Sequence, residues 1–139
     1  MEKEFTISIC MPVYQGSHLI RDAIDSICKQ EFQSYELLIG DDNKPEAKSE
    51  IERTKSILDS YDEPRIKYAK NKQNLGYPAN LKSIVARSTM DILFLMAQDD
   101  ILSNDALQKT HDAFLLDENI GVVTRPYFWF YDSLDKPVR

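Results

Sequence analysis

Glycine is scarce in this chain of 139 residues, which contains only Gly16, Gly40, Gly76 and Gly121. These four are too far apart to form the glycine-rich loop that cradles phosphates in nucleotide-binding proteins of the P-loop and dinucleotide types. No apolar run approaches the roughly 20 residues of a membrane-spanning helix, and no apolar signal region follows the N-terminus. We therefore expect a cytoplasmic protein without a transmembrane segment, which must hold any phosphate group by other means.

Cysteine and basic residues are also limited. Cys10 and Cys28 are the only cysteines, and without histidines at metal-ligand spacing they predict plain buried thiols rather than a zinc site or a disulfide framework. Lysine and arginine number 17 against 23 aspartates and glutamates, which gives a formal net charge of -6 at pH 7. This balance argues against nucleic acid as a partner, because its phosphates attract basic surfaces. Any anionic ligand would need a cation beside it.

Short apolar segments alternate with segments of helical periodicity along the chain. Between the first two apolar segments, for example, apolar residues recur at Ile20, Ala23, Ile24 and Ile27, which is the spacing of one helix face. This alternation predicts an α/β fold with a mainly parallel sheet and helices on both faces. At this length we expect one domain, residues 1–139. The predicted strands are residues 6–13, 35–40, 65–69, 92–97 and 121–124.

Polar or aromatic groups follow three of these strands. Residues 92–97 are uniformly apolar, which predicts a strand buried on both faces, and they lead through Gln98 to the pair Asp99-Asp100. The second strand ends on Asp41-Asp42, and the first ends on Pro12-Val13-Tyr14. Parallel strands bring their carboxyl ends to one edge of a sheet, so these groups should meet there. With strand order 3-2-1-4, the first and fourth strands flank the crevice where such sheets bind ligands.

Each acidic pair also has a structural explanation, since aspartate is common in turns and at helix starts. Two pairs at equivalent strand ends favour a ligand site instead. A divalent cation held by Asp100 would allow phosphate to bind in this acidic setting, because it bridges carboxylate and phosphate oxygens. A phospho-accepting receiver domain is a poorer explanation. Its acidic pair should follow the first strand, where this chain has Pro12-Val13-Tyr14.

Four motifs in order resemble the family 2 inverting glycosyltransferases, which have the GT-A fold: ISICMPVYQG, YELLIGDDN, NLGYPANL and DILFLMAQDDIL. The resemblance runs from about Thr6 to about Thr124. It implies a Rossmann-like GT-A nucleotide-binding domain. The implied reaction transfers a sugar from a nucleotide-diphosphate sugar, in first place a UDP-sugar, to an acceptor hydroxyl with inversion. Mn²⁺ or Mg²⁺ would assist it, and polysaccharide biosynthesis is the implied setting.

The resemblance also implies roles for single residues. Pro12-Val13-Tyr14 match the loop that lies against the base, and Asp41 matches the carboxylate that accepts a hydrogen bond from it, with Asp42 as neighbour. Residues 98–100 stand at the DXD-type motif, in which Asp100 would bind Mn²⁺ or Mg²⁺ directly and Asp99 would lie near the ribose or a metal-bound water. Gln98 departs from a strict DXD. The full nucleotide-binding set is Pro12, Val13, Tyr14, Asp41, Asp42, Asn74, Gly76, Asn80, Gln98 and Asp99.

The resemblance places the catalytic general base beyond Arg139, in a half that binds a glycan or lipid-linked acceptor. We therefore expect a chain truncated before that half, whose acceptor would bring it to the inner face of the membrane. The alternative is a non-catalytic nucleotide-sugar-binding fragment or assembly module. Residues 127–131 are five consecutive aromatics, which suggests a surface that another part of the protein or a second copy, as a homodimer, would cover. An edge strand folded back onto its own domain is the other explanation.

Overall fold

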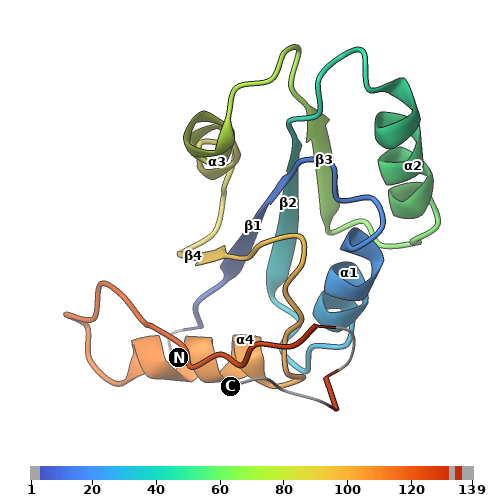
Figure 1. Cartoon of the computed structure of the whole chain (residues 1–139). Coiled ribbons are helices and arrows are strands. Elements are labelled where there is room, and N and C mark those ends of the chain that lie inside the picture. Colours follow the sequence, from blue (N-terminus) through green and yellow to red (C-terminus); the bar gives the residue numbers. More distant parts are fainter. Residues whose placement is uncertain (1–3, 132–133, 136–139) are drawn as a thin grey trace.

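A computed structural model describes residues 4–131, 134 and 135. Its four strands form one parallel sheet in the order β3-β2-β1-β4 (Figure 1), which confirms the predicted α/β fold and strand order. Within the described residues, no helix combines the length and apolar character that crossing a membrane requires. The elements are β1 (Ile7–Val13), α1 (Ile20–Cys28), β2 (Tyr35–Asp41), α2 (Lys48–Asp59), β3 (Ile66–Lys70), α3 (Tyr77–Val85), β4 (Ile92–Leu95) and α4 (Ala106–Leu115).

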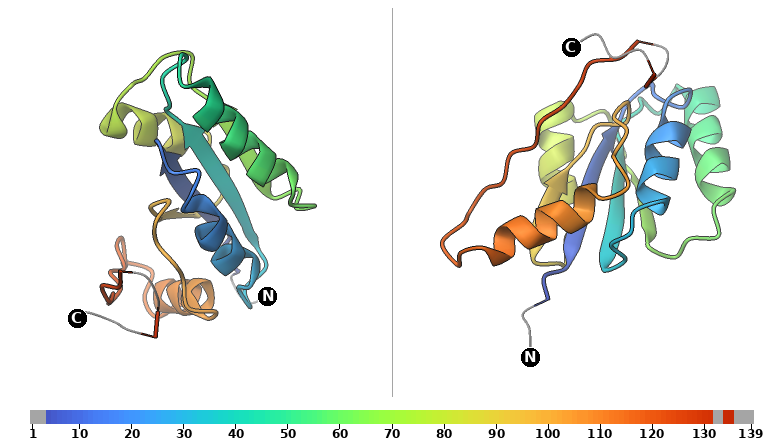
Figure 2. Two further views of the ribbon diagram at one scale, coloured as in Figure 1. Left: turned by 45° about the vertical axis from the view of Figure 1, so that its right-hand side comes forward. Right: turned by 90° about the horizontal axis from the view of Figure 1, so that it is seen from below.

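Helices cover both faces of the sheet, as predicted. Successive side chains of a strand point to opposite faces, so the central strand β1 contributes to two cores. Ile9 and Met11 pack with α1 in the larger core, whereas Cys10 packs with Leu38 and with Ile84 of α3 in the smaller one. Figure 2 shows α1 and α2 on one side of the sheet and α3 on the other.

The two cysteines are free. Cys10 is fully buried, and burial raises the pKa of its thiol to about 11, so it stays protonated near neutral pH. This confirms a plain buried thiol at Cys10. Cys28, at the end of α1, is only partly buried.

Strand β4 is more exposed than predicted. Ile92 and Phe94 are buried, but Leu93 and Leu95 on the other face are 46% and 50% exposed. The prediction of a strand buried on both faces is therefore wrong. The reason is position: β4 pairs with β1 at the edge of the described sheet, and α3 packs against β1 and β2.

The predicted fifth strand, residues 121–124, is also wrong. Residues 121–129 have no regular secondary structure and run along the outside after α4 (Figure 1). Val122 is 79% exposed, so its β-branched side chain has neither a core nor a strand to pack against. In the aromatic segment, residues 127–131, Tyr127, Phe128, Trp129 and Tyr131 are all at least 65% exposed, which contradicts the expectation of an edge strand folded onto the domain.

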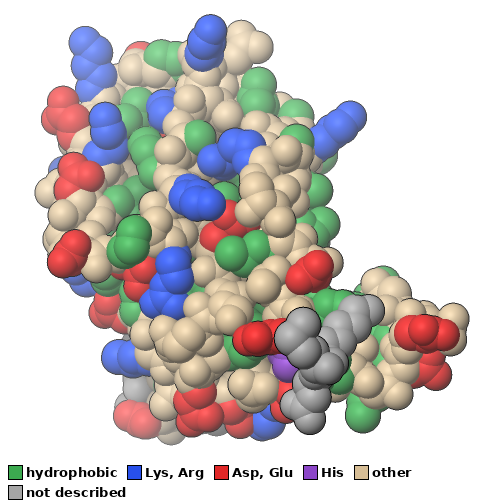
Figure 3. All heavy atoms as spheres, turned by 180° about the vertical axis from the view of Figure 1, so that it is seen from behind, with side chains coloured by type: hydrophobic (Ala, Val, Ile, Leu, Met, Phe, Trp, Pro, Cys, Tyr) green, Lys and Arg blue, Asp and Glu red, His purple; other side chains and the backbone are tan. Residues whose placement is uncertain are grey.

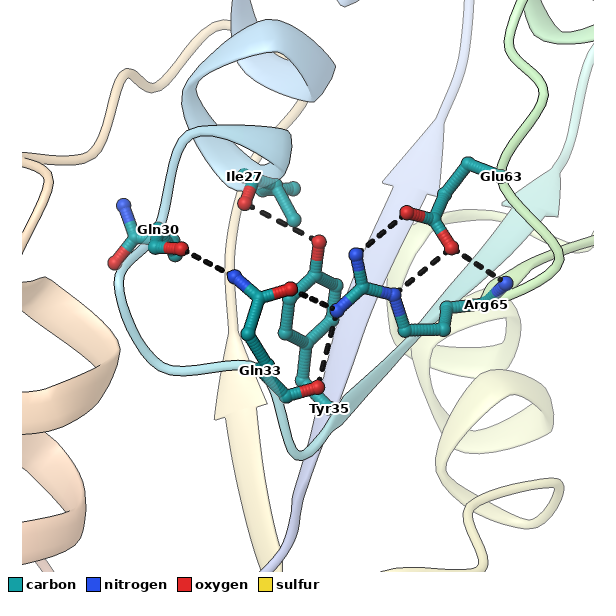
Figure 4. A network of polar contacts seen from close by, with 6 residues as sticks. All are labelled: Ile27, Gln30, Gln33, Tyr35, Glu63 and Arg65. Atoms are coloured by element: carbon teal, nitrogen blue, oxygen red, sulfur yellow. Dashed lines mark hydrogen bonds and ion pairs between the residues drawn. The ribbon is translucent and has the colours of Figure 1, made fainter.

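At the amino-terminal edge of the sheet, polar contacts fix the start of β2 (Figure 4). The Arg65 guanidinium donates to both carboxylate oxygens of Glu63 and to the backbone and side chain of Gln33. It also lies 4.1 Å from the ring centroid of Tyr35. The Arg65 hydrogen bonds lower the pKa of Glu63 to about 2. The polar side chains of this network therefore find their hydrogen-bond partners within the chain.

Candidate functional site

The carboxyl ends of β1, β2 and β4 meet at one edge of the sheet, as the parallel topology predicted. Gln98, after β4, accepts a hydrogen bond from the Tyr14 backbone N–H at 3.1 Å and donates one to the Tyr14 carbonyl at 2.9 Å. Asn43, after β2, accepts from the Gln15 backbone N–H at 2.8 Å. Side chains that follow β2 and β4 are thereby hydrogen-bonded to the backbone that follows β1.

Asp41 ends β2 with no exposed surface. One carboxylate oxygen accepts from the Asn43 backbone N–H at 2.8 Å and the other from the Tyr68 hydroxyl at 2.6 Å. Burial and the neighbouring Asp41 carboxylate raise the pKa of the Tyr68 phenol, so it remains a donor. The carboxylate still has acceptor capacity, but because Asp41 is fully buried, a nucleotide base could reach it only if neighbouring groups moved aside. Base recognition by Asp41 stays a prediction.

The Asp42 carboxylate lies inward and organises the loop between β3 and α3. Its two oxygens accept four hydrogen bonds, from the side chains of Asn71 and Asn74 and from the backbone N–H groups of Leu75 and Gly76, at 2.8 to 3.0 Å. Only 3% of Asp42 is exposed. Gly76 has φ of +79°, a left-handed conformation that glycine adopts without strain. These five residues form the Asp42 network, which joins three of the predicted site residues.

Three other predicted residues support this edge from the interior. The buried Asn80 side chain donates to the Gly40 carbonyl at 2.9 Å and accepts from Asn71 at 2.9 Å. Val13 is fully buried, and its carbonyl accepts from the Asp42 backbone N–H at 2.8 Å. Pro12 is partly buried. Direct contact of Val13 or Asn80 with a nucleotide would therefore require the edge to open.

Four of the predicted residues are exposed to solvent, namely Tyr14, Asn74, Asp99 and Asp100. The Tyr14 residue is 41% exposed. One Asp100 oxygen accepts from the Ala97 backbone N–H at 3.3 Å, and its other oxygen has no hydrogen bond to a described residue. The described residues contain no group of three or more His, Cys, Asp or Glu placed to hold a metal ion. Two carboxylates still fit Mg²⁺ or Mn²⁺, because such ions complete their shell with phosphate oxygens and water.

Arg125 belongs to no motif in the sequence, yet the structure brings it beside this edge. Its guanidinium carbon lies 3.7 Å from the ring centroid of Phe94, and Nη2 donates to the Leu95 carbonyl at 3.2 Å. Burial lowers the pKa of Arg125, whereas the nearby Asp100 charge raises it. The charge of Arg125 therefore interacts with that of the predicted metal ligand, Asp100. On the face seen in Figure 3, acidic and basic side chains are interspersed rather than gathered by sign.

Comparison with known proteins identifies a matching family and two curated relatives. Residues 8–139 match the model of the family described as glycosyl transferase family 2. The chain is 31% identical over 127 residues to an uncharacterized glycosyltransferase of Haemophilus influenzae, covering 91% of this chain and 48% of that protein. The chain spans half or less of the length of the curated relatives it matches.

Solved structures show the same fold. A mannosyltransferase, PcManGT from Pyrobaculum calidifontis, in complex with GDP-Man and Mn²⁺, has a TM-score of 0.70 at 18% identity, over 86% of this chain and 34% of that chain. TarS of S. aureus in complex with UDP-GlcNAc has a TM-score of 0.63 at 18% identity, over 78% of this chain and 31% of that chain. At such identities the likeness concerns the fold alone.

Proposed function

The chain belongs to glycosyl transferase family 2, and from this premise we propose that it binds the nucleotide-diphosphate part of a sugar donor at the carboxyl edge of its sheet. The single observation that supports this most is the pairing at that edge of an exposed aromatic ring, Tyr14, with an exposed carboxylate pair, Asp99-Asp100, through Gln98. An aromatic face suits a base and carboxylates suit a cation bound to diphosphate.

In this proposal the chain's residues bind and orient the donor. Asp100, with Asp99 beside it, holds the cation, and Tyr14 lies against the base. When bound, Mn²⁺ or Mg²⁺ supplies Lewis-acid stabilisation of the diphosphate leaving group. The Asp42 network keeps the loop of residues 71–76 in one conformation. The entropy cost of ordering this loop on donor binding is therefore smaller.

Sugar transfer also requires an acceptor hydroxyl and a general base that takes its proton. We assign neither to this chain. Both would come from a longer protein of the kind represented by the relative of which the chain spans 48%. The proposal further includes transfer with inversion at the anomeric carbon and a glycan or lipid-linked acceptor. It also includes a role in polysaccharide biosynthesis and a cytoplasmic location near the membrane. A nucleotide-sugar-binding module without catalysis is the second candidate, and it shares the same binding step.

UDP is expected to bind more tightly than CDP in the presence of Mn²⁺. A carboxylate only accepts hydrogen bonds, so Asp41 favours the N3–H of uracil and opposes the N3 acceptor of cytosine. Two unpaired acceptors cost about 1 to 3 kcal/mol, or roughly ten- to a hundredfold in affinity. Competition among UDP, CDP and GDP measures the preference.

Two variants locate the base-reading group. Asp41→Asn replaces one acceptor oxygen with a donor, so the preference for UDP should shrink or invert. Tyr68→Phe is the matched control: it removes the hydroxyl that donates to Asp41 and should keep the preference. Equal affinities for UDP and CDP in the original protein would rule out base reading by a carboxylate at this edge. An unchanged preference in Asp41→Asn would rule out Asp41.

We also propose that the aromatic segment mediates a homodimer, because its side chains present a large exposed apolar surface. Sedimentation at increasing concentration should give a mass that rises toward twice that of the chain. Trp129→Ser should weaken this association. Leu116→Ser is the control, since Leu116 is 81% exposed but lies outside the segment. A single mass of one chain at all concentrations would refute the dimer.

A further inference from the structure

Gln98 was predicted to touch the nucleotide, but its amide is occupied within the chain. The carbonyl oxygen accepts from Tyr14 N–H and the amide nitrogen donates to the Tyr14 carbonyl. The side chain also lies directly on Gly16, where an added Cβ would overlap the Gln98 amide. Gln98 therefore fills the space over the loop of residues 14–17, here called the Tyr14 loop.

The Tyr14 loop is held at two further points. Gln15 has φ of 49°, a left-handed conformation that is uncommon for residues with a side chain, and its N–H donates to Asn43. Ser17 donates from its N–H and its hydroxyl to the Glu50 carboxylate, at 2.8 and 2.9 Å. Among these ties, the one from Gln98 acts on the backbone of Tyr14 itself. It is also the one that comes from the residue directly before Asp99.

We propose that Gln98 is a positioning residue that fixes the Tyr14 backbone, and with it the ring, relative to Asp99 and Asp100. The inference rests on the proposed function, in which Tyr14 lies against the base and the two aspartates act at the diphosphate. An aspartate at this position, as in a strict DXD, is shorter and has no donor for the Tyr14 carbonyl. Glutamine reaches and satisfies both backbone groups, which accounts for the departure from that motif.

Gln98→Met tests the functional consequence, because methionine is similar in length and uncharged but cannot form the two amide hydrogen bonds. With Mn²⁺ present, we expect UDP affinity to fall roughly tenfold, whereas affinity for pyrophosphate, which has no base, should stay unchanged. In a Tyr14→Ala background, Gln98→Met should cause no further loss, since residues that act through one another are not additive. Parallel losses for both ligands, or additive losses in the double variant, would overturn the inference.

A second measurement needs no ligand. The Tyr14 amide donates to Gln98, so its hydrogen exchange should accelerate by roughly tenfold or more in Gln98→Met. The Ile9 amide, inside β1, serves as the control and should exchange at an unchanged rate. If the original protein fails to bind UDP, the proposed function fails, and this measurement still decides whether Gln98 restrains Tyr14. An unchanged Tyr14 exchange rate would overturn the inference in either case.

Discussion

Asp100→Ala is expected to weaken Mn²⁺-dependent binding of UDP by at least about a hundredfold. Substituting a residue that only hydrogen-bonds to a metal ligand already lowers metal affinity by about 10- to 100-fold, and loss of a direct ligand should cost more. The chain carries a formal charge of -6, and Asp99 and Asp100 lie exposed at the end of β4. An anionic diphosphate is repelled by these carboxylates unless a divalent cation bridges the two. Calorimetric titration with UDP, first with Mn²⁺ and then with excess chelator, measures the effect.

Asp62→Ala is the matched control for Asp100→Ala, because Asp62 is an exposed aspartate between α2 and β3 and its loss changes the net charge equally. It should bind UDP as the original protein does. Equal UDP affinity with and without metal would show that the proposed role of the cation is wrong. If binding depends on metal but Asp100→Ala binds UDP as tightly as the original protein, Asp100 is not the metal ligand.

Asp42→Ala is expected to destabilise the fold by about 3 kcal/mol, because a buried donor left unpaired costs about 1 to 3 kcal/mol. The Asp42 carboxylate accepts four hydrogen bonds, and two of the donors are backbone groups, of Leu75 and Gly76. Water can reach part of the loop and offset some of the loss. Urea unfolding measures the free energy difference.

Asp42→Asn should lower the free energy of unfolding by about half as much as Asp42→Ala. One of the two acceptor oxygens becomes a donor that faces other donors. Asp62→Ala again serves as the control and should change stability by less than about 0.5 kcal/mol. A similarly small change for Asp42→Ala would mean that the loop of residues 71–76 does not depend on its carboxylate. In that case Asp42 would be available to a ligand, as the resemblance first suggested.

The positions of the first three strands could be predicted because they follow from short-range patterns, and the strand order could be expected from the usual topology of parallel α/β sheets. Apolar residues at alternating or helical spacing place β1, β2 and α1 within a residue or two of their observed bounds. The exposure of Leu93 and Leu95 could not be predicted in this way, because it depends on which elements lie next to β4. The prediction of a strand at residues 121–124 was wrong for a related reason. A strand-forming composition does not produce a strand unless a neighbouring strand is there to pair with it.

The location of the candidate site could be predicted from the sequence, but the hydrogen bonds within it could not. Topology alone brings the ends of β1, β2 and β4 together. Whether a polar side chain there faces solvent or the chain depends on loop conformations, so the inward turn of Asp42 and the pairing of Gln98 with Tyr14 could not be foreseen. Arg125 was missed because its contact with Phe94 depends on the path of an irregular segment.

The most direct test of the proposed function is to observe where UDP binds. We suggest titrating UDP with Mg²⁺ into the isotope-labelled chain and following the backbone amides by NMR. The proposed site predicts saturable shifts at Tyr14, Gln98 and the Asp99-Asp100 pair, and none at Gln33 in the network of Figure 4. No shifts at saturating UDP, or shifts confined to the amino-terminal edge of the sheet, would contradict a nucleotide site at the carboxyl edge.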